Sequence, residues 1–350
     1  RCLTHFELTP VSGVNLLIGD NGAGKTSVIE AIHVLGYGRS FRSRIRDGLI
    51  QHGSEQLQIT ARWLDTNKLH HQAGVQYNGN TWLARVDGES TNQLGQFCAN
   101  FPVLSFEPGS HELISGTSDV RRRFIDWALF HVEPDFFLQW RRFSRALKQR
   151  NALLKTNPSD QDLQAWDVEF SESGELIANY RQNYIDALIV QQMPIVQVLL
   201  PECGNLQLTY NPGWRNEQLT LLDALRLNRD RDRQLGFSSS GPHRADWLPV
   251  FNQFLSREHF SRGQAKLVAL SCLLAQAQHF QIVKGCWPVL CFDDLASELD
   301  ENHFKQVLQW LALTNGQIWI SGTEILPVYK NLFNNHKVFH VEHGLVSERE

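Results

Sequence analysis

A glycine-rich loop near the start of the chain constrains its fold more than any other feature. The sequence GDNGAGKT at residues 19–26 fits the phosphate-binding pattern G-x-x-x-x-G-K-[ST]. Residues 14–18, which precede it, are apolar and β-prone and predict a strand. From Lys25 to Leu35, apolar residues recur at helical spacing. Strand, glycine loop and helix are the context in which this pattern binds phosphate, so we expect an α/β fold around a nucleotide site.

Each part of this loop has an expected role. The glycines permit a tight turn whose backbone N–H groups face one point, and the helix N-terminus completes the phosphate cradle. Lys25 would reach the β- and γ-phosphates, and the Thr26 hydroxyl would bind Mg²⁺. The structural alternative is a glycine turn followed by a surface lysine. The expected nucleotide-binding residues are Gly19, Asp20, Asn21, Gly22, Ala23, Gly24, Lys25, Thr26 and Ser27.

The acidic partner that such a loop needs lies far along the chain. VLCFDD at residues 289–294 places Asp293 at the end of an apolar strand. There its carboxylate can meet the Mg²⁺ held by Thr26, and Asp294 can orient or deprotonate an attacking water. The alternative is that both aspartates cap the next helix. Given the loop, we assign catalysis to Lys25, Asp293 and Asp294, and metal binding to Thr26 and Asp293.

A third motif, SRGQ, comes before a helix predicted over residues 264–280. Ser261 is a good helix N-cap, which is the structural reading. A serine hydroxyl, the N–H of Gly263 and a helix dipole also form an anion site. Two copies arranged head to tail would place one phosphate loop and one such helix end around each nucleotide.

Composition sets the broad class of the protein. The chain has 350 residues, 42% of them hydrophobic, and a net charge of −4, so a globular protein with local rather than global cationic patches is expected. Apolar runs such as residues 267–275 are too short to span a bilayer. The six cysteines have no C-x-x-C spacing, so we expect reduced thiols in a cytoplasmic protein, with no zinc site and no membrane partner.

The order of elements predicts an insertion. Strands are expected at residues 56–64, 75–88 and 101–106, with N-G and D-G turns. From residue 120 the pattern is helical to about residue 202, with a polar break at 155–162. Strands return near the C-terminus. We therefore expect one α/β ATPase domain made of residues 1–115 and 240–350, with a mostly helical domain inserted at 116–239.

The order GDNGAGKT, SRGQ, LCFDDLASELD resembles the ATP-binding-cassette ATPases, in the branch that contains the SMC heads. Within that branch the chain is similar to the RecF family over essentially its whole length. The segments that carry this resemblance are EAIHVLGYGRSFRS, RRRFIDWALFHVEPDFFLQW, LKQRNALL, RDRQL and GPHRAD.

The resemblance implies a P-loop ATPase head with ATP and Mg²⁺ as cofactors. It makes the phosphate loop the Walker A motif and Asp293 the Walker B aspartate. Asp300 becomes the D-loop residue near a dimer interface. The segment that acts in trans on the partner's ATP becomes Ser261, Arg262, Gly263 and Gln264.

The resemblance also implies a function in DNA repair, replication and recombination. Members dimerise around two ATP molecules and bind gapped, single-stranded and double-stranded DNA. They work with RecR and RecO and help to load a recombinase. Their ATP hydrolysis is slow and DNA-dependent, and it serves as a release step.

Three departures from the family pattern stand out. Asp294 stands where many cassette ATPases have glutamate, and its shorter arm fits a slow enzyme. No switch histidine follows the strand at 317–322, so Ser321 or Thr323 would have to take its place. The Q-loop glutamine has no clear position.

Several basic groups are candidate DNA contacts. Arg141, Arg145 and Lys148 fall at i, i+4 and i+7, on one helix face that could track phosphates. A solvated face is the alternative. Arg42 and Arg44 lie in a second basic segment. A third group, residues 121–123, is followed by apolar residues that favour packing. No base-reading motif is visible, so recognition of DNA form rather than of sequence is expected.

Three other classes of protein remain as alternatives. A transporter nucleotide-binding subunit would be shorter and lack the arginine-rich insertion. A P-loop kinase or GTPase would have its acidic strand closer to the loop and no SRGQ segment. A purely structural DNA clamp would not need Lys25, Thr26 and Asp293 intact.

Overall fold

The computed structural model describes residues 5–42, 49–65, 68–91, 93–156, 158–251, 260–342 and 344–349. The chain divides into two compact units. The first unit is made of Arg1–Ser110 and Phe280–Glu350, and the second is His111–His279. Within the described ranges, none of the helices is long and apolar enough to cross a lipid bilayer.

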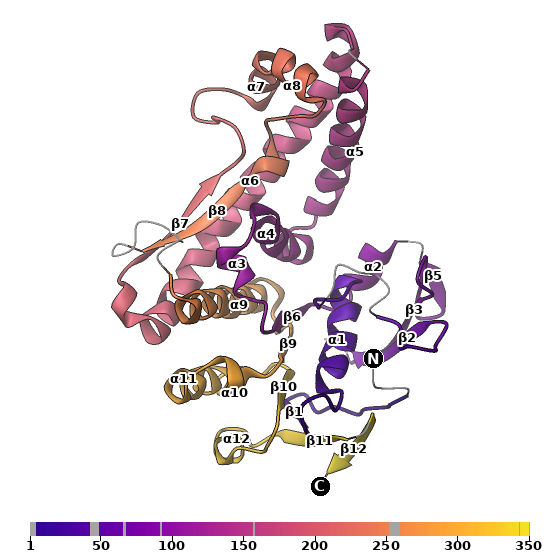
Figure 1. Cartoon of the computed structure of the whole chain (residues 1–350), viewed down its shortest axis with the longest axis vertical. Coiled ribbons are helices and arrows are strands. Elements are labelled where there is room, and N and C mark those ends of the chain that lie inside the picture. The colour runs from indigo at the N-terminus through magenta and orange to yellow at the C-terminus, as the bar shows by residue number, and fades with distance from the viewer. Residues whose placement is uncertain are drawn as a thin grey trace. The chain divides into compact units, whose positions relative to one another are not determined.

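A six-stranded sheet organises the first unit, in the order β12-β11-β1-β10-β9-β6 (Figure 1). Strand β1 runs parallel to both β10 and β11, β9 runs parallel to β10 and β6, and β12 is antiparallel to β11. The two ends of the chain thus share one sheet, which confirms the α/β head. The strands are β1 (Val14–Ile18), β6 (Val103–Phe106), β9 (Val289–Phe292), β10 (Ile318–Gly322), β11 (His336–Glu342) and β12 (Leu345–Arg349).

Helix α1 (Lys25–Tyr37) packs its apolar face on this sheet. Val28 and Ile29 join Leu17, Cys291 and Phe339 in one buried cluster. Parallel strands covered by helices are buried along their whole length, and every residue of β1 and β10 is buried. Among the described residues, this unit also contains the helices α2 (Leu94–Cys98), α10 (Leu295–Glu298), α11 (Glu301–Ala312) and α12 (Pro327–Leu332).

A second sheet, antiparallel, follows α1 in the chain and has the order β2-β3-β4-β5. The predicted N-G and D-G turns join its strands, at Asn78-Gly79 and Asp87-Gly88. At the D-G turn both residues have positive φ, 50° and 86°, as a two-residue hairpin requires. The strands are β2 (Leu57–Leu64), β3 (His70–Tyr77), β4 (Trp82–Val86) and β5 (Glu89–Thr91).

The second unit is mostly helical and includes a helix of 40 residues, α6 (Asp160–Leu199). The polar break of the sequence lies between α5 and α6, and Ser159 caps α6 by accepting a hydrogen bond from Asp162 N. The other elements are α3 (Glu112–Ser115), α4 (Ser118–Val132), α5 (Phe136–Leu154), η2 (Pro201–Cys203), β7 (Leu206–Asn211), α7 (Leu221–Leu227), α8 (Arg229–Leu235), η3 (Pro242–Arg244), β8 (Asp246–Phe251) and α9 (Arg262–Lys284).

The division into units places most of α9 with the helical unit, so the first unit resumes at residue 280 rather than at 240. Strand β8 pairs with β7 of the helical unit, and polar groups link α9 to the helices of the same unit. Gln276 Nε2 donates to Phe124 O on α4 at 2.9 Å, and Gln192 Nε2 on α6 donates to Ser271 Oγ at 3.0 Å. Which stretch acts as the ATPase domain in function stays a prediction.

A buried charge network joins three helices of the second unit. Arg150 on α5 donates to Asp167 on α6 and to Asp232 on α8, both at 2.7 Å, and to Ser238 Oγ at 2.9 Å. The three charged side chains are fully buried. Removing Arg150 would take the cationic partner from the buried Asp232 carboxylate, so this network fixes how α5, α6 and α8 pack. It gives the LKQRNALL and RDRQL segments a structural role.

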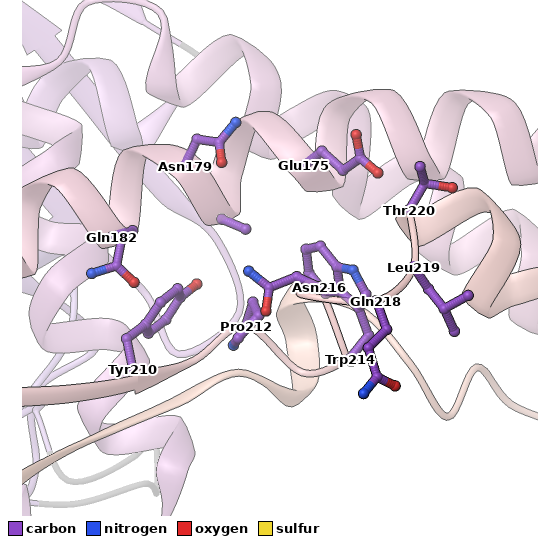
Figure 2. Close-up of a pocket in the computed structure, with 11 residues that line it drawn as sticks. Glu175, Asn179, Gln182, Tyr210, Pro212, Trp214, Asn216, Gln218, Leu219 and Thr220 are labelled. Atoms are coloured by element: carbon purple, nitrogen blue, oxygen red, sulfur yellow. The ribbon is translucent and has the colours of Figure 1, made fainter.

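A pocket of about 470 Å³ lies in the second unit, between α6 and the segment that leads from β7 to α7 (Figure 2). Asn179 and Gln182 on α6 face Tyr210 and Trp214 across it. None of its lining residues is a site residue predicted from the sequence.

Candidate nucleotide-binding site

The phosphate loop runs from β1 to α1, and its glycines are required by close approach and by backbone conformation. A Cβ on Gly19 would lie 2.0 Å from Val341 O, so any side chain there would displace β11. Gly24, the N-cap of α1, has φ 119°, a conformation that only glycine adopts readily. The loop therefore takes the form that the sequence motif predicts.

Lys25 lies over this loop and is 8% exposed. Its Nζ donates to Gly19 O at 2.6 Å and to Asp20 O at 2.9 Å. Burial lowers the pKa of Lys25, an effect that the carboxylates of Asp294, Asp293 and Asp20 oppose. These carbonyl bonds hold the ammonium where it can contact phosphate oxygens bound in the loop.

Thr26 and Asp293 are in contact although they lie 267 positions apart in the chain. Thr26 Oγ1 donates to Asp293 Oδ1 at 3.1 Å, and Ser321 Oγ donates to the same oxygen at 2.8 Å. Burial raises the pKa of Asp293, against the hydrogen bonds from Ser321 and Thr26. A hydroxyl and a carboxylate side by side are the oxygen ligands that Mg²⁺ prefers, so these residues fit the expected metal.

Asp294 follows in a left-handed conformation, with φ 57° and ψ 40°. It occupies the N-cap position of α10, but its carboxylate accepts no capping hydrogen bond. Instead, Asp294 Oδ1 accepts from Ser297 Oγ at 2.8 Å, and Asp294 N donates to Ser321 Oγ at 2.9 Å. The helix-cap alternative therefore describes the position of Asp294 but not the contacts of its side chain.

The SRGQ segment forms a capping box at the start of α9. Gln264 N donates to Ser261 Oγ at 3.2 Å, and Ser261 N donates to Gln264 Oε1 at 3.0 Å. Arg262 and Gly263 between them are exposed. The structural reading of Ser261 is thus observed, and the role of this segment in trans stays a prediction.

Asp300 also caps a helix, α11, by accepting from Asn302 N and His303 N, both at 3.0 Å. Its predicted place at a dimer interface is compatible with its exposed position and stays a prediction.

The basic groups differ in their surroundings. Arg141, Arg145 and Lys148 are exposed on α5, and the Arg145 guanidinium lies 6.0 Å from the centre of the Trp166 ring. Arg42 is also exposed. Arg44 lies outside the described residues.

Arg121 belongs to the fold rather than to a cationic surface. It is 1% exposed, and its Nε donates to Asp246 Oδ1 at 2.6 Å. This ion pair confirms, for Arg121, the prediction that residues 121–123 pack inside the protein.

Sequence reasoning left Ser321 without a defined role, and the structure places it against both aspartates. The available signal was a polar residue at the end of an otherwise apolar strand, QIWISG. Because β10 lies between β1 and β9, that residue ends beside the loop and beside Asp293.

Comparison with known proteins identifies the family of this chain. Residues 3–346 match the family described as RecF/RecN/SMC N terminal domain. The DNA replication and repair protein RecF of Xanthomonas euvesicatoria pv. vesicatoria is 50% identical over 347 residues, which cover 98% of this chain and 94% of that protein. The protein of the same name from Vibrio parahaemolyticus is 37% identical and covers 99% of this chain and 96% of its own length.

Solved structures agree with this assignment. The recombination mediator protein RecF of the RecFOR pathway, solved with ATP, is 26% identical and has a TM-score of 0.89 over 100% of this chain and 95% of that one. An SMC head bound to the C-terminal winged-helix domain of ScpA is 14% identical and has a TM-score of 0.59, over 97% of this chain and 90% of that one, and shares the fold. The chain belongs to the RecF family, within the RecF/RecN/SMC N-terminal domain group.

Proposed function

We propose that this chain is an ATP-dependent DNA-binding protein of recombinational repair. The observation that carries the proposal is the contact of Thr26 Oγ1 with Asp293 Oδ1, which joins the phosphate loop to a distant strand end as an ATP site requires. Support comes from the RecF relative that was solved with ATP and from relatives named for DNA replication and repair.

In this proposal each residue of the site has one task. The backbone N–H groups of residues 19–27 and the Lys25 ammonium would bind the phosphates, and Thr26 and Asp293 would hold Mg²⁺. When bound, the metal would neutralise charge that develops on the transferred phosphoryl group. Asp294 orients the attacking water and accepts its proton. Its short side chain is expected to make hydrolysis slow.

The nucleotide would also join two protomers. Ser261 to Gln264 of one protomer would contact the ATP held by the phosphate loop of the other, with Asp300 close to the interface. ATP binding then favours the dimer, and DNA-dependent hydrolysis releases it. Because a helix N-terminus attracts anions and Arg262 and Gly263 are exposed at the start of α9, the SRGQ segment is suited to a γ-phosphate.

The DNA substrate would be a gapped duplex or a junction of single and double strands, contacted through phosphates by Arg141, Arg145 and Lys148, with Arg42 and Arg44 as further candidates. RecR- and RecO-type mediators would be its partners in recombinase loading. Its place of action would be the cytoplasm, with no membrane partner.

Fluorescence anisotropy of a labelled gapped duplex, titrated with protein in ATP and in ADP at one fixed salt concentration, tests the proposal. We expect tighter binding in ATP, with a dependence on protein concentration steep enough to require a dimer. The Lys25→Ala variant is the matched control and should bind equally in both nucleotides. Absence of DNA binding in either nucleotide would overturn the DNA role and leave an ATPase of another kind, such as a transporter subunit.

A further inference from the structure

We propose that Ser321 is a positioning residue that holds both aspartates of the nucleotide site in their working orientation. The inference deepens the proposed ATPase function and rests on it. Ser321 is the fourth residue of β10 and is 1% exposed. It pairs in register with Leu17 of β1, the strand that leads into the phosphate loop, and β10 also pairs with β9, the strand that leads into Asp293.

One hydroxyl of Ser321 makes two hydrogen bonds of opposite sense. It donates to Asp293 Oδ1 at 2.8 Å and accepts from Asp294 N at 2.9 Å. A serine hydroxyl has a single proton to donate, so these bonds fix its orientation. Rotating the hydroxyl toward any other acceptor would leave the buried Asp293 carboxylate with one hydrogen bond fewer.

The bond from Asp294 N supports an uncommon backbone conformation. A non-glycine residue at φ 57° lies in the strained left-handed region, and it persists where neighbouring groups hold it. In this conformation the Asp294 carboxylate accepts from Ser297 Oγ at 2.8 Å. The Ser321 hydroxyl therefore helps to fix the positions of both carboxylates.

The two hydroxyls on Asp293 Oδ1 differ in what metal binding would ask of them. Thr26 is an expected Mg²⁺ ligand, so its hydroxyl would serve the metal through an oxygen lone pair while its proton goes to Asp293. Ser321 is not an expected ligand, so its hydroxyl serves the two aspartates alone. Ser321 can thus keep the carboxylate in place with and without the metal, as supporting residues around metal ligands do.

The simpler explanation is that these contacts only give the buried Ser321 hydroxyl the hydrogen bonds that it needs in the core. Buried serines often do so by bonding a carbonyl of the preceding turn, as Ser271 does with Val268 O at 2.7 Å. Ser321 instead bonds residues 28 and 27 positions away, both of them at the nucleotide site. The two explanations differ in what deletion of the hydroxyl does to metal-dependent nucleotide binding.

The experiment uses the full chain and the variants Ser321→Ala and Ser321→Thr. ATP binding is measured by calorimetry without metal, and again as Mg²⁺ is titrated at fixed ATP, with Tm measured for each variant. For Ser321→Ala we expect the affinity for ATP without metal to stay within about twofold of the wild type. The Mg²⁺ concentration that gives half of the metal's effect on ATP binding should rise by roughly 10–100-fold. The kcat for ATP hydrolysis should fall by a similar factor, roughly 10–100-fold. Ser321→Thr keeps the hydroxyl and should restore both.

Ser105→Ala is the matched control, because Ser105 lies on β6 of the same sheet and its hydroxyl contacts His33 rather than either aspartate. We expect its Mg²⁺ dependence to match the wild type whatever its Tm. Equal changes in Ser321→Ala and Ser105→Ala, or an unchanged Mg²⁺ dependence in Ser321→Ala, would overturn the positioning role. A wild-type chain that binds no ATP would overturn the proposed function itself, so the two failures are distinguishable.

Discussion

Among single residues, Lys25 should matter most for nucleotide binding. Its ammonium is held by two loop carbonyls at 2.6 and 2.9 Å, so the cation is already placed before a phosphate arrives. Lys25→Ala removes this charge from a largely buried position beside the glycines. We expect ATP affinity to fall by at least about 100-fold, as loss of a charge-assisted contact in a buried site implies. Calorimetric titration with Mg²⁺-ATP measures it.

Lys305→Ala gives the matching control, since Lys305 is an exposed lysine on α11 paired with Glu301. Removing the same charge there should leave ATP affinity unchanged. If Lys25→Ala bound ATP with near wild-type affinity, the assignment of the phosphate loop would be wrong.

His33, on the buried side of α1, should make stability depend on pH. Its Nδ1 lies 3.0 Å from Ser105 Oγ, and burial, with the charge of Arg39, lowers the pKa of His33 from 6.5 to about 3. Between these values the unfolded chain binds a proton that the folded chain does not. The stabilisation from the neutral imidazole is therefore complete above pH 6.5 and is lost as the pH falls towards 3.

The expected loss in free energy of unfolding is about 2 kcal/mol between neutral pH and about pH 5. His33→Gln can keep a hydrogen bond to Ser105 but does not titrate, so it should flatten this pH dependence. Urea unfolding of the first unit at the two pH values measures the effect. His70→Gln, at an exposed position on β3, should change nothing. Parallel pH curves for His33→Gln and the wild type would refute the prediction.

Several secondary-structure elements could be predicted from local sequence patterns alone. The strand β1, the loop and α1 follow from residues adjacent in the chain, and so does the strand before Asp293. Contacts between distant elements followed where two motifs imply each other, as for Thr26 and Asp293, but not elsewhere. Arg121 and Arg141 are alike in sequence context, yet Arg121 is buried and pairs with Asp246, 125 positions away, whereas Arg141 is exposed. The role of Ser321 was open for the same reason, because its partners come from another strand.

Helix α5 supplies the testable element for DNA binding. Arg141, Arg145 and Lys148 are exposed along one face, whereas Arg142 between them is paired with Glu169 at 2.8 Å. We expect the triple alanine variant to bind duplex and gapped DNA more weakly, without a change in sequence preference. The slope of log affinity against log salt should fall by about 0.9 for each DNA phosphate that the variant no longer neutralises. Anisotropy titrations at several salt concentrations give this slope.

Arg226→Ala on α7 provides a control in the same unit, because Arg226 is an exposed arginine outside this face. Its salt slope should equal that of the wild type. A triple variant with an unchanged slope would show that α5 is a solvated face, and the other basic residues would become the candidates.

The variant Ser261→Ala tests whether the nucleotide site is shared between two protomers. Ser261→Ala removes a helix cap, which costs about 1 kcal/mol by itself. Ser159→Ala removes the equivalent capping box at α6 and controls for that loss. We expect both variants to bind ATP nearly normally, but only Ser261→Ala to remain monomeric in ATP, as judged by analytical ultracentrifugation.

A mixture of Lys25→Ala and Ser261→Ala protomers makes the sharper prediction. Each variant alone should stay monomeric in ATP, because every composite site then lacks one half. In a mixed dimer that pairs head to tail, one site carries both defects, and the other has an intact Lys25 from one protomer and an intact Ser261 from its partner. Mixing should therefore restore ATP-dependent dimers with one active site per dimer, although each protomer still carries its own substitution. A mixture that sediments as monomers at every protein concentration at which the wild type dimerises would argue that each protomer completes its own site.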